Sequence, residues 1–104
     1  MNDEANTLTL IADYVATYHR KNVIENRPRF KAAYPLQEAW WVAFKTTFYS
    51  YSDMARVFEK DHTTIMHGVA AVDKRRYDHP AVFFRTELYL ERFYPQGVTD
   101  AMRS

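Results

Sequence analysis

The densest group of hydrogen-bonding side chains in this sequence is the run K-D-H-T-T over residues 60–64, followed three residues later by His67. Ammonium, carboxylate, imidazole and hydroxyl groups at this spacing suit three kinds of chemistry. They serve as metal ligands, as a catalytic relay, or as partners for the base edges and phosphates of a nucleic acid. The secondary structure that carries them decides among these.

Metal binding and catalysis fit the spacing poorly. His62 and His67 are five residues apart, about 140° around a helix, so they do not share a face as an i, i+4 pair would. Adjacent Asp61, His62 and Thr63 point apart, and no distant residue is evident to orient a relay. The chain has no cysteine and only two glycines, and it lacks a glycine-rich phosphate loop. We therefore expect no enzymatic activity, catalytic residue, metal, cofactor or nucleotide.

Apolar spacing predicts a short helix before this run. Met54, Val57 and Phe58 recur at i, i+3 and i+4, after a polar segment at 50–53 whose side chains can satisfy free N–H groups. Residues 59–61 then interrupt the apolar pattern. The segment therefore predicts a helix of about two turns followed by a tight turn.

A second helix is predicted to start at the polar run. Ile65, Val69 and Val72 follow at i, i+4 and i+7, and Asp61 is a plausible N-cap. The side opposite Ile65 carries mostly polar or small side chains, which lie within about 60° of one another: Thr63, His67, Ala70 and Lys74. We expect this side to face outward.

Such a helix pair is typical of a helix-turn-helix, in which the second helix enters a DNA major groove. The positive N-terminal end of that helix also favours a phosphate. Many helix pairs with similar spacing carry only core residues, so the spacing by itself leaves both interpretations open.

The residue identities carry more information. The run K-D-H-T-T-I-M-H, preceded by M-A-R-V-F, resembles the signature of the C-terminal DNA-binding domain of the bacterial chromosomal replication initiator DnaA, I-G-x-x-F-(G)-x-[KR]-D-H-T-T-V-x-H-[AS]. Upstream, P-L-Q-E-A-W-W-V-A-F over 35–44 more faintly resembles that family's A-R-P-R-Q-x-A-M-x-L helix. R-P-R-F-K over 27–31 falls where the family carries a basic loop. The resemblance covers about residues 8–72.

The resemblance implies a set of DNA-binding residues. In that family the signature reaches base edges and phosphates, its second histidine touches the backbone, a basic-loop arginine enters the minor groove, and the upstream glutamine contacts a phosphate. The matching residues here are Arg27, Arg29, Lys31, Gln37, Lys60, Asp61, His62, Thr63, Thr64 and His67.

Four departures from the family pattern stand near the signature. Ala55 replaces the usual glycine, and the turn before Lys60 is one residue shorter than the commonest form. Gly68 replaces alanine or serine, and Ala71 occupies a usually basic position. The family's exact DNA site is therefore not carried over to this chain.

The remaining sequence predicts an all-α fold of about five helices in a single domain over residues 1–104. With 104 residues, of which 47% are hydrophobic and 16% aromatic, the chain suits one core better than two. The segments that we expect, in order, are a helix over 7–19, a loop over 20–33, a helix from Pro35 to about Phe48, the helix pair, a charged segment over 73–79, a last helix over about 80–94 and a frayed tail over 95–104.

Individual residues of these segments have predicted roles. His19 closes the first helix and is given no chemistry. Trp40 and Phe44 belong to the core stripe of the central helix, whereas Trp41 falls off that stripe. The charges over 20–31 fit either a solvated loop or an arm for a minor groove, and the resemblance favours the arm.

The charge and hydropathy of the sequence limit where the protein is expected in the cell and what it is expected to bind. No run approaches the roughly 18 apolar residues of a membrane span, and the first residues lack the pattern of a secretory signal, so a cytoplasmic protein is expected. The net charge is only +1, but basic residues cluster over 20–31 and 74–76.

These patterns together predict sequence-specific binding of double-stranded DNA, regulating transcription or replication initiation, as a small phage or mobile-element protein would. The alternative is a protein-interaction module that keeps the helix-turn-helix fold without binding DNA. The last helix is apolar on more than one side, and part of Phe84, Leu88 and Tyr89 is expected to remain for a homodimer partner.

Overall fold

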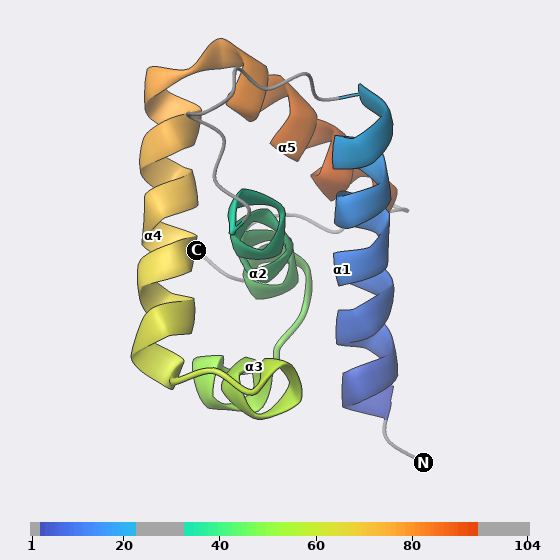
Figure 1. The fold of residues 1–104 in the computed structure, drawn as a ribbon, viewed down its shortest axis with the longest axis vertical. Helices are drawn as coiled ribbons and strands as arrows, with labels where there is room; N and C mark the ends of the chain where they lie inside the picture. Colours follow the sequence, from blue (N-terminus) through green and yellow to red (C-terminus); the bar gives the residue numbers. More distant parts are fainter. Residues whose placement is uncertain (1–2, 23–32, 94–104) are drawn as a thin grey trace.

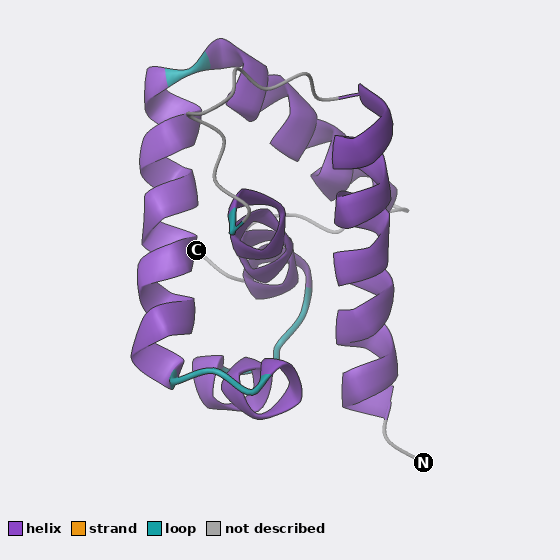
Figure 2. Cartoon of the chain, in the orientation of Figure 1, coloured by secondary structure: helices purple, strands orange, loops and turns teal. Residues whose placement is uncertain are grey.

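The part of the chain that the structure describes forms five α-helices, and three of them pack against a central one. The structure is a computed structural model that describes residues 3–22 and 33–93. The helices are α1 Asp3–Asn22, α2 Tyr34–Thr46, α3 Tyr51–Phe58, α4 His62–Asp78 and α5 Pro80–Phe93. Within the described segments every regular element is helical, and short loops join α2 to α3, α3 to α4 and α4 to α5 (Figure 2). The predicted all-α class with about five helices is confirmed.

Helix α2 lies at the centre of the fold. In Figure 1 it is seen nearly end-on between α1 and α4, while α3 lies at one end of the molecule and α5 at the other. Six consecutive residues of α2, 38–43, are buried. A helix buried on all sides needs neighbours on all sides, and α1, α4 and α5 each pack against it.

The core is built from the apolar stripes that the sequence predicts for α1, α3 and α4. Its buried side chains come from all five helices and include Leu8, Ile11, Val15, Trp40, Trp41, Met54, Ile65, Val69, Val72, Tyr89 and Leu90. Trp40 is therefore a packing residue, as predicted. Trp41, which falls off the predicted stripe, is also buried, because α2 has no solvent-facing side along 38–43.

Two helices are longer than predicted because their ends carry polar rather than periodic apolar residues. Helix α1 begins at Asp3 and continues through Arg20 and Lys21, which the sequence places in a loop. Helix α4 continues past Val72 to Asp78. Its last turns include an i, i+4 ion pair between the exposed Lys74 and Asp78, with Nζ and Oδ2 2.8 Å apart.

The predicted extension of α2 to Phe48 is wrong. The helix ends at Thr46, and the next residue, Thr47, has extended backbone angles. The hydroxyls of Thr46 and Thr47 donate back to the carbonyls of Val42 and Ala43, at 2.8 and 2.6 Å, which competes with further helix growth. Phe48 consequently lies outside the helix and is 68% exposed.

The last helix begins at Pro80, as predicted, because the proline follows an extended His79 that ends α4. It ends at Phe93, and the expected tail over 95–104 lies outside the described residues. None of the helices in the described segments has the length and apolar character needed to cross a bilayer.

Candidate functional site

The start of α3 is held by a reciprocal pair of hydrogen bonds. The Asp53 N–H donates to Ser50 Oγ at 3.0 Å, and the Ser50 N–H donates to Asp53 Oδ2 at 2.9 Å. The backbone N–H of Ser50 and the guanidinium of Arg56 hold the pKa of Asp53 below its ordinary value. This capping box fixes where α3 begins and therefore where the following turn lies.

The turn between α3 and α4 is a sharp reversal centred on Glu59. Its backbone is left-handed, with φ 57° and ψ 48°, and the Lys60 N–H donates to the Ala55 carbonyl at 2.9 Å. A left-handed residue followed by this bond is the ending in which glycine is usual. Glu59 thus takes a conformation that favours glycine, and it lets three residues, 59–61, connect the two helices.

The first residues of α4 form an ordered polar cluster. Asp61 is the N-cap, as predicted, and its carbonyl accepts from the N–H groups of Thr64 and Ile65 at 3.0 and 3.2 Å. Its carboxylate accepts from the Thr63 hydroxyl and makes no side-chain cap bond to the helix backbone. The Thr63 hydroxyl and the neighbouring His62 hold the pKa of Asp61 below its ordinary value, so the carboxylate stays ionised near neutral pH.

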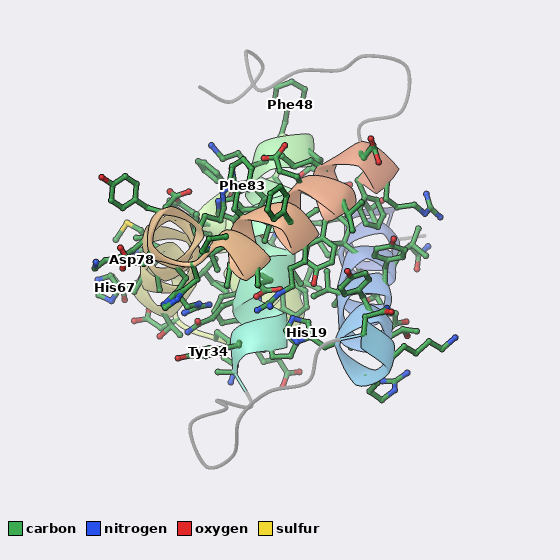
Figure 3. The ribbon with its side chains drawn as sticks, turned by 90° about the horizontal axis from the view of Figure 1, so that it is seen from above. His19, Tyr34, Phe48, His67, Asp78 and Phe83 are labelled. Carbon is green, nitrogen blue, oxygen red and sulfur yellow. The ribbon has the colours of Figure 1, made fainter. Side chains whose placement is uncertain are left out.

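We call residues 60–64 together with His67 the tip. Lys60, Asp61, His62, Thr64 and His67 are exposed and Thr63 is half-buried, while Ile65 is fully buried beneath them. His67 lies on the outer side of α4, turned away from α2 (Figure 3). Helix α5 packs at the opposite end of the molecule, so it leaves the tip uncovered (Figure 1).

Gln37 lies beside α4, but its side chain is engaged. Its Oε1 accepts from Arg75 Nη2 at 3.0 Å, and the Arg75 guanidinium lies 4.0 Å from the centre of the Tyr34 ring. The start of α2 therefore runs along the middle and end of α4. Figure 3 shows Tyr34 and His67 toward the same side of the molecule. A phosphate at Gln37 would use its amide N–H groups, because the oxygen is already bonded.

Gly68 explains how closely α4 approaches α2. A Cβ built on Gly68 would lie 2.6 Å from Cε3 of Trp40 and 3.2 Å from Cγ of Gln37. Glycine, in place of the alanine or serine of the family that the sequence resembles, therefore leaves room for the large indole beneath it. The position of the tip relative to α2 depends on this contact.

The charges around the tip nearly balance. Lys60 is exposed, but Glu59 and Asp61 flank it. Farther along α4, Lys74 pairs with Asp78, and Arg76 Nη2 lies 2.9 Å from Glu87 Oε2. Arg27, Arg29 and Lys31, the basic-loop residues of the predicted site, lie outside the described residues.

A buried polar cluster, which the sequence pattern did not predict, joins α1, α2 and α5. The fully buried Glu38 carboxylate accepts from His19 Nε2 at 2.7 Å, from the Tyr89 hydroxyl at 3.0 Å and from Arg85 Nη2 at 2.7 Å. Burial alone would raise the pKa of Glu38, but the hydrogen bonds and charges of His19 and Arg85 lower it overall. Burial and the nearby carboxylate raise the pKa of Tyr89 far above its ordinary value.

This cluster corrects two predictions. His19 does not close α1, which continues to Asn22; it is buried against Glu38. Tyr89 was expected in part for a partner chain, but it is fully buried. The available signal was a single acid, Glu38, inside the otherwise apolar middle of α2, which points to an internal cation.

A second polar contact ties α2 to the later part of α4. The indole N–H of Trp41 donates to Asp73 Oδ1 at 2.7 Å.

In the part of the chain that the structure describes, no group of three or more His, Asp or Glu side chains is placed to hold a metal ion. Comparison with protein-family models, with curated proteins and with solved structures finds no match for this chain.

Proposed function

We propose that this chain binds double-stranded DNA sequence-specifically, with α3 and α4 acting as a helix-turn-helix that resembles the box-binding domain of DnaA. The observation that carries the proposal is the tip. A carboxylate, an imidazole and two threonines stand at the exposed start of a helix whose opposite side is core. Polar side chains at the start of a second helix are the groups that reach base edges in this motif.

Each tip residue has a role that follows from its chemistry. The ionised Asp61 accepts from a cytosine or adenine amino group, and His62 and Thr64 bond to base edges or phosphates. The Thr63 hydroxyl is bonded to Asp61, so its methyl group is the part suited to pack against a thymine methyl. Lys60 contacts a phosphate.

Residues outside the tip would position the duplex. His67 of α4 and the amide N–H groups of Gln37, on the neighbouring α2, contact the phosphate backbone. Arg27 or Arg29 enters the adjacent minor groove, with Lys31 near its phosphates. Because the charges around the tip nearly balance, we propose that this basic segment supplies much of the electrostatic attraction.

Contacts within the chain hold the tip in one arrangement, which supports a recognition role. The Asp61–Thr63 hydrogen bond, the left-handed turn at Glu59 and the contact of Gly68 with Trp40 each restrict it. Groups that are already in place lose less entropy on binding. We propose that the chain acts by occupying DNA sites, as a regulator of transcription or of replication initiation.

A gel shift tests this proposal. Wild-type protein is titrated at about 150 mM salt against a duplex carrying a nonamer similar to the initiator's box and against a scrambled duplex of the same composition. We expect retardation of the first duplex at a protein concentration at least about tenfold lower than that of the second. Equal binding of both would contradict sequence specificity.

Two observations favour a second candidate, a protein-interaction module that does not bind DNA. The outer side of α5 exposes large apolar side chains, and the net charge is only +1. Unchanged mobility of both duplexes in the same gel shift would support this alternative and contradict DNA binding.

A further inference from the structure

Helix α5 has an exposed apolar face, which within the described part of the chain Arg76 partly covers at Phe83. We define the α5 face as Ala81, Phe83, Phe84 and Leu88, all of which are exposed. Phe84 is 66% exposed, Leu88 46% and Phe83 39%, and the two phenylalanine rings meet edge to face at 5.7 Å. The opposite side of α5 holds Tyr89 and Arg85 in the core. One side of α5 therefore packs into the core, and the exposed side still carries large apolar residues.

We propose that the α5 face binds the α5 face of a second copy of this chain, with the two helices antiparallel. Phe84 and Leu88 are four residues apart, so they form one ridge along the helix. In an antiparallel pair centred between them, each Phe84 meets the partner's Leu88. A patch that is complementary to itself about a two-fold axis is what a symmetric dimer requires.

The charges at the ends of α5 agree with this arrangement. Its first turn, all of it described, contains no acidic residue, so the positive end of the helix dipole has no acid of its own. Glu91, by contrast, is exposed near the C-terminal end, where an acid is unfavourable for its own helix. In the antiparallel pair each Glu91 lies opposite the partner's Ala81, in the first turn of the partner's helix.

An ion pair, Arg76 with Glu87, lies at the edge of the α5 face. Arg76 lies over the Phe83 ring at 4.6 Å and binds Glu87 on the flank of α5 at 2.9 Å. Near the two-fold axis, the Arg76 and Glu87 of one copy approach the same pair on the other. Each copy then offers both signs of charge at the rim of the interface.

The size of the α5 face determines how strong a dimer we expect. The exposed portions of its three large side chains amount to about 300 Å², the low end of patches with a binding role. Such an interface is small, so we expect a weak, concentration-dependent dimer rather than an obligate one. The tip lies at the other end of the molecule and remains uncovered in the dimer (Figure 1).

Sedimentation velocity across a wide concentration range tests whether the α5 face mediates self-association. The full chain should shift from monomer toward dimer as concentration rises. Phe84→Glu should weaken the dimer at least about tenfold. Phe48→Glu is the matched control, because Phe48 is an equally exposed phenylalanine outside α5, and it should leave the dimer unchanged. A wild-type chain that stays monomeric throughout, or a dimer that Phe84→Glu does not weaken, would overturn the proposal.

A charge exchange tests the antiparallel register. Ala81→Lys should strengthen the dimer about two- to fivefold by pairing with the partner's Glu91, and Glu91→Lys should weaken it. In a Glu91→Lys background, Ala81→Lys should weaken it further. Residues 81 and 91 are about 15 Å apart along one helix, so this dependence cannot arise within a single chain. Independent effects of the two substitutions would exclude this register.

Discussion

The backbone of Gly68 lies directly against the indole of Trp40, close enough that a Cβ there would sit 2.6 Å from the ring. This contact sets the distance between α4, which carries the tip, and the buried helix α2. A glycine inside a helix normally costs stability, so its presence here is explained by the space that the indole needs.

Gly68→Ala should therefore lower the free energy of unfolding by about 1–3 kcal/mol, although alanine is the better helix former. Urea unfolding followed by circular dichroism measures the change. A Trp40→Leu background removes the ring atoms in question, and the same substitution there should be neutral or stabilising. An equal loss in both backgrounds would show that the Gly68–Trp40 contact is not the cause.

The left-handed conformation of Glu59 predicts a change in stability of the opposite sign when glycine is introduced there. Glu59→Gly should raise the free energy of unfolding by up to about 1 kcal/mol, because glycine adopts this region without a steric penalty. Glu59→Ala is the control, since it removes the same carboxylate but keeps the Cβ, and it should bring no gain. If Glu59→Ala stabilises the protein as much as Glu59→Gly does, the loss of the charge rather than the backbone conformation is responsible for the gain.

The buried carboxylate of Glu38 predicts how stability depends on pH. The pKa of Glu38 is lower in the folded protein than its ordinary value of 4.5, so the unfolded chain binds this proton more readily. The contribution of Glu38 is fully present above about pH 4.5 and is lost as the pH falls through the folded value. Denaturant unfolding measured from neutral to acidic pH should show stability falling over that range.

Glu38→Gln isolates this contribution. The substitution leaves Arg85 buried without its negative partner, so it should lower the free energy of unfolding by about 3–5 kcal/mol at neutral pH. It should also reduce the loss of stability below about pH 4.5 relative to wild type. The same acid dependence in the variant would assign the effect to the exposed carboxylates instead.

Lys60→Ala tests the phosphate role of the first tip residue. It should weaken binding to all duplexes alike and flatten the dependence of log K on log salt by about one, because one phosphate contact is lost. Fluorescence anisotropy titrations at several salt concentrations measure both quantities. Lys45→Ala provides a control, since Lys45 is a lysine in the last turn of α2 and not part of the tip. A change in sequence preference would instead assign Lys60 to base contacts.

The sequence predicted most of the helices because their buried stripes are regular. Leu8, Ile11 and Val15 in α1, and Ile65, Val69 and Val72 in α4, lie in the core as their spacing indicates. The exposed position of the tip follows from the same periodicity. These features depend on residues close to one another in the chain.

The features that the sequence did not predict depend on distant residues. The buried Glu38 carboxylate is paired by residues far along the chain, among them Arg85, 47 positions later. The indole of Trp41 similarly meets Asp73. Phe48 continues the apolar period of α2, yet two threonine hydroxyls bonded back to the helix end it first. Local spacing carries no information on such pairings.

The central proposal is that the tip reads bases, and selection of bound duplexes from a random pool tests it most directly. Wild-type protein should recover a defined consensus. Thr63→Ser, which removes the methyl group, and Thr64→Val, which removes the hydroxyl, should each relax a single position of it, at a cost of about 1–3 kcal/mol. Thr9→Val, at an exposed threonine of α1, should leave the consensus unchanged. Recovery of no consensus by the wild-type chain, or of the same consensus by both tip variants, would contradict the proposal.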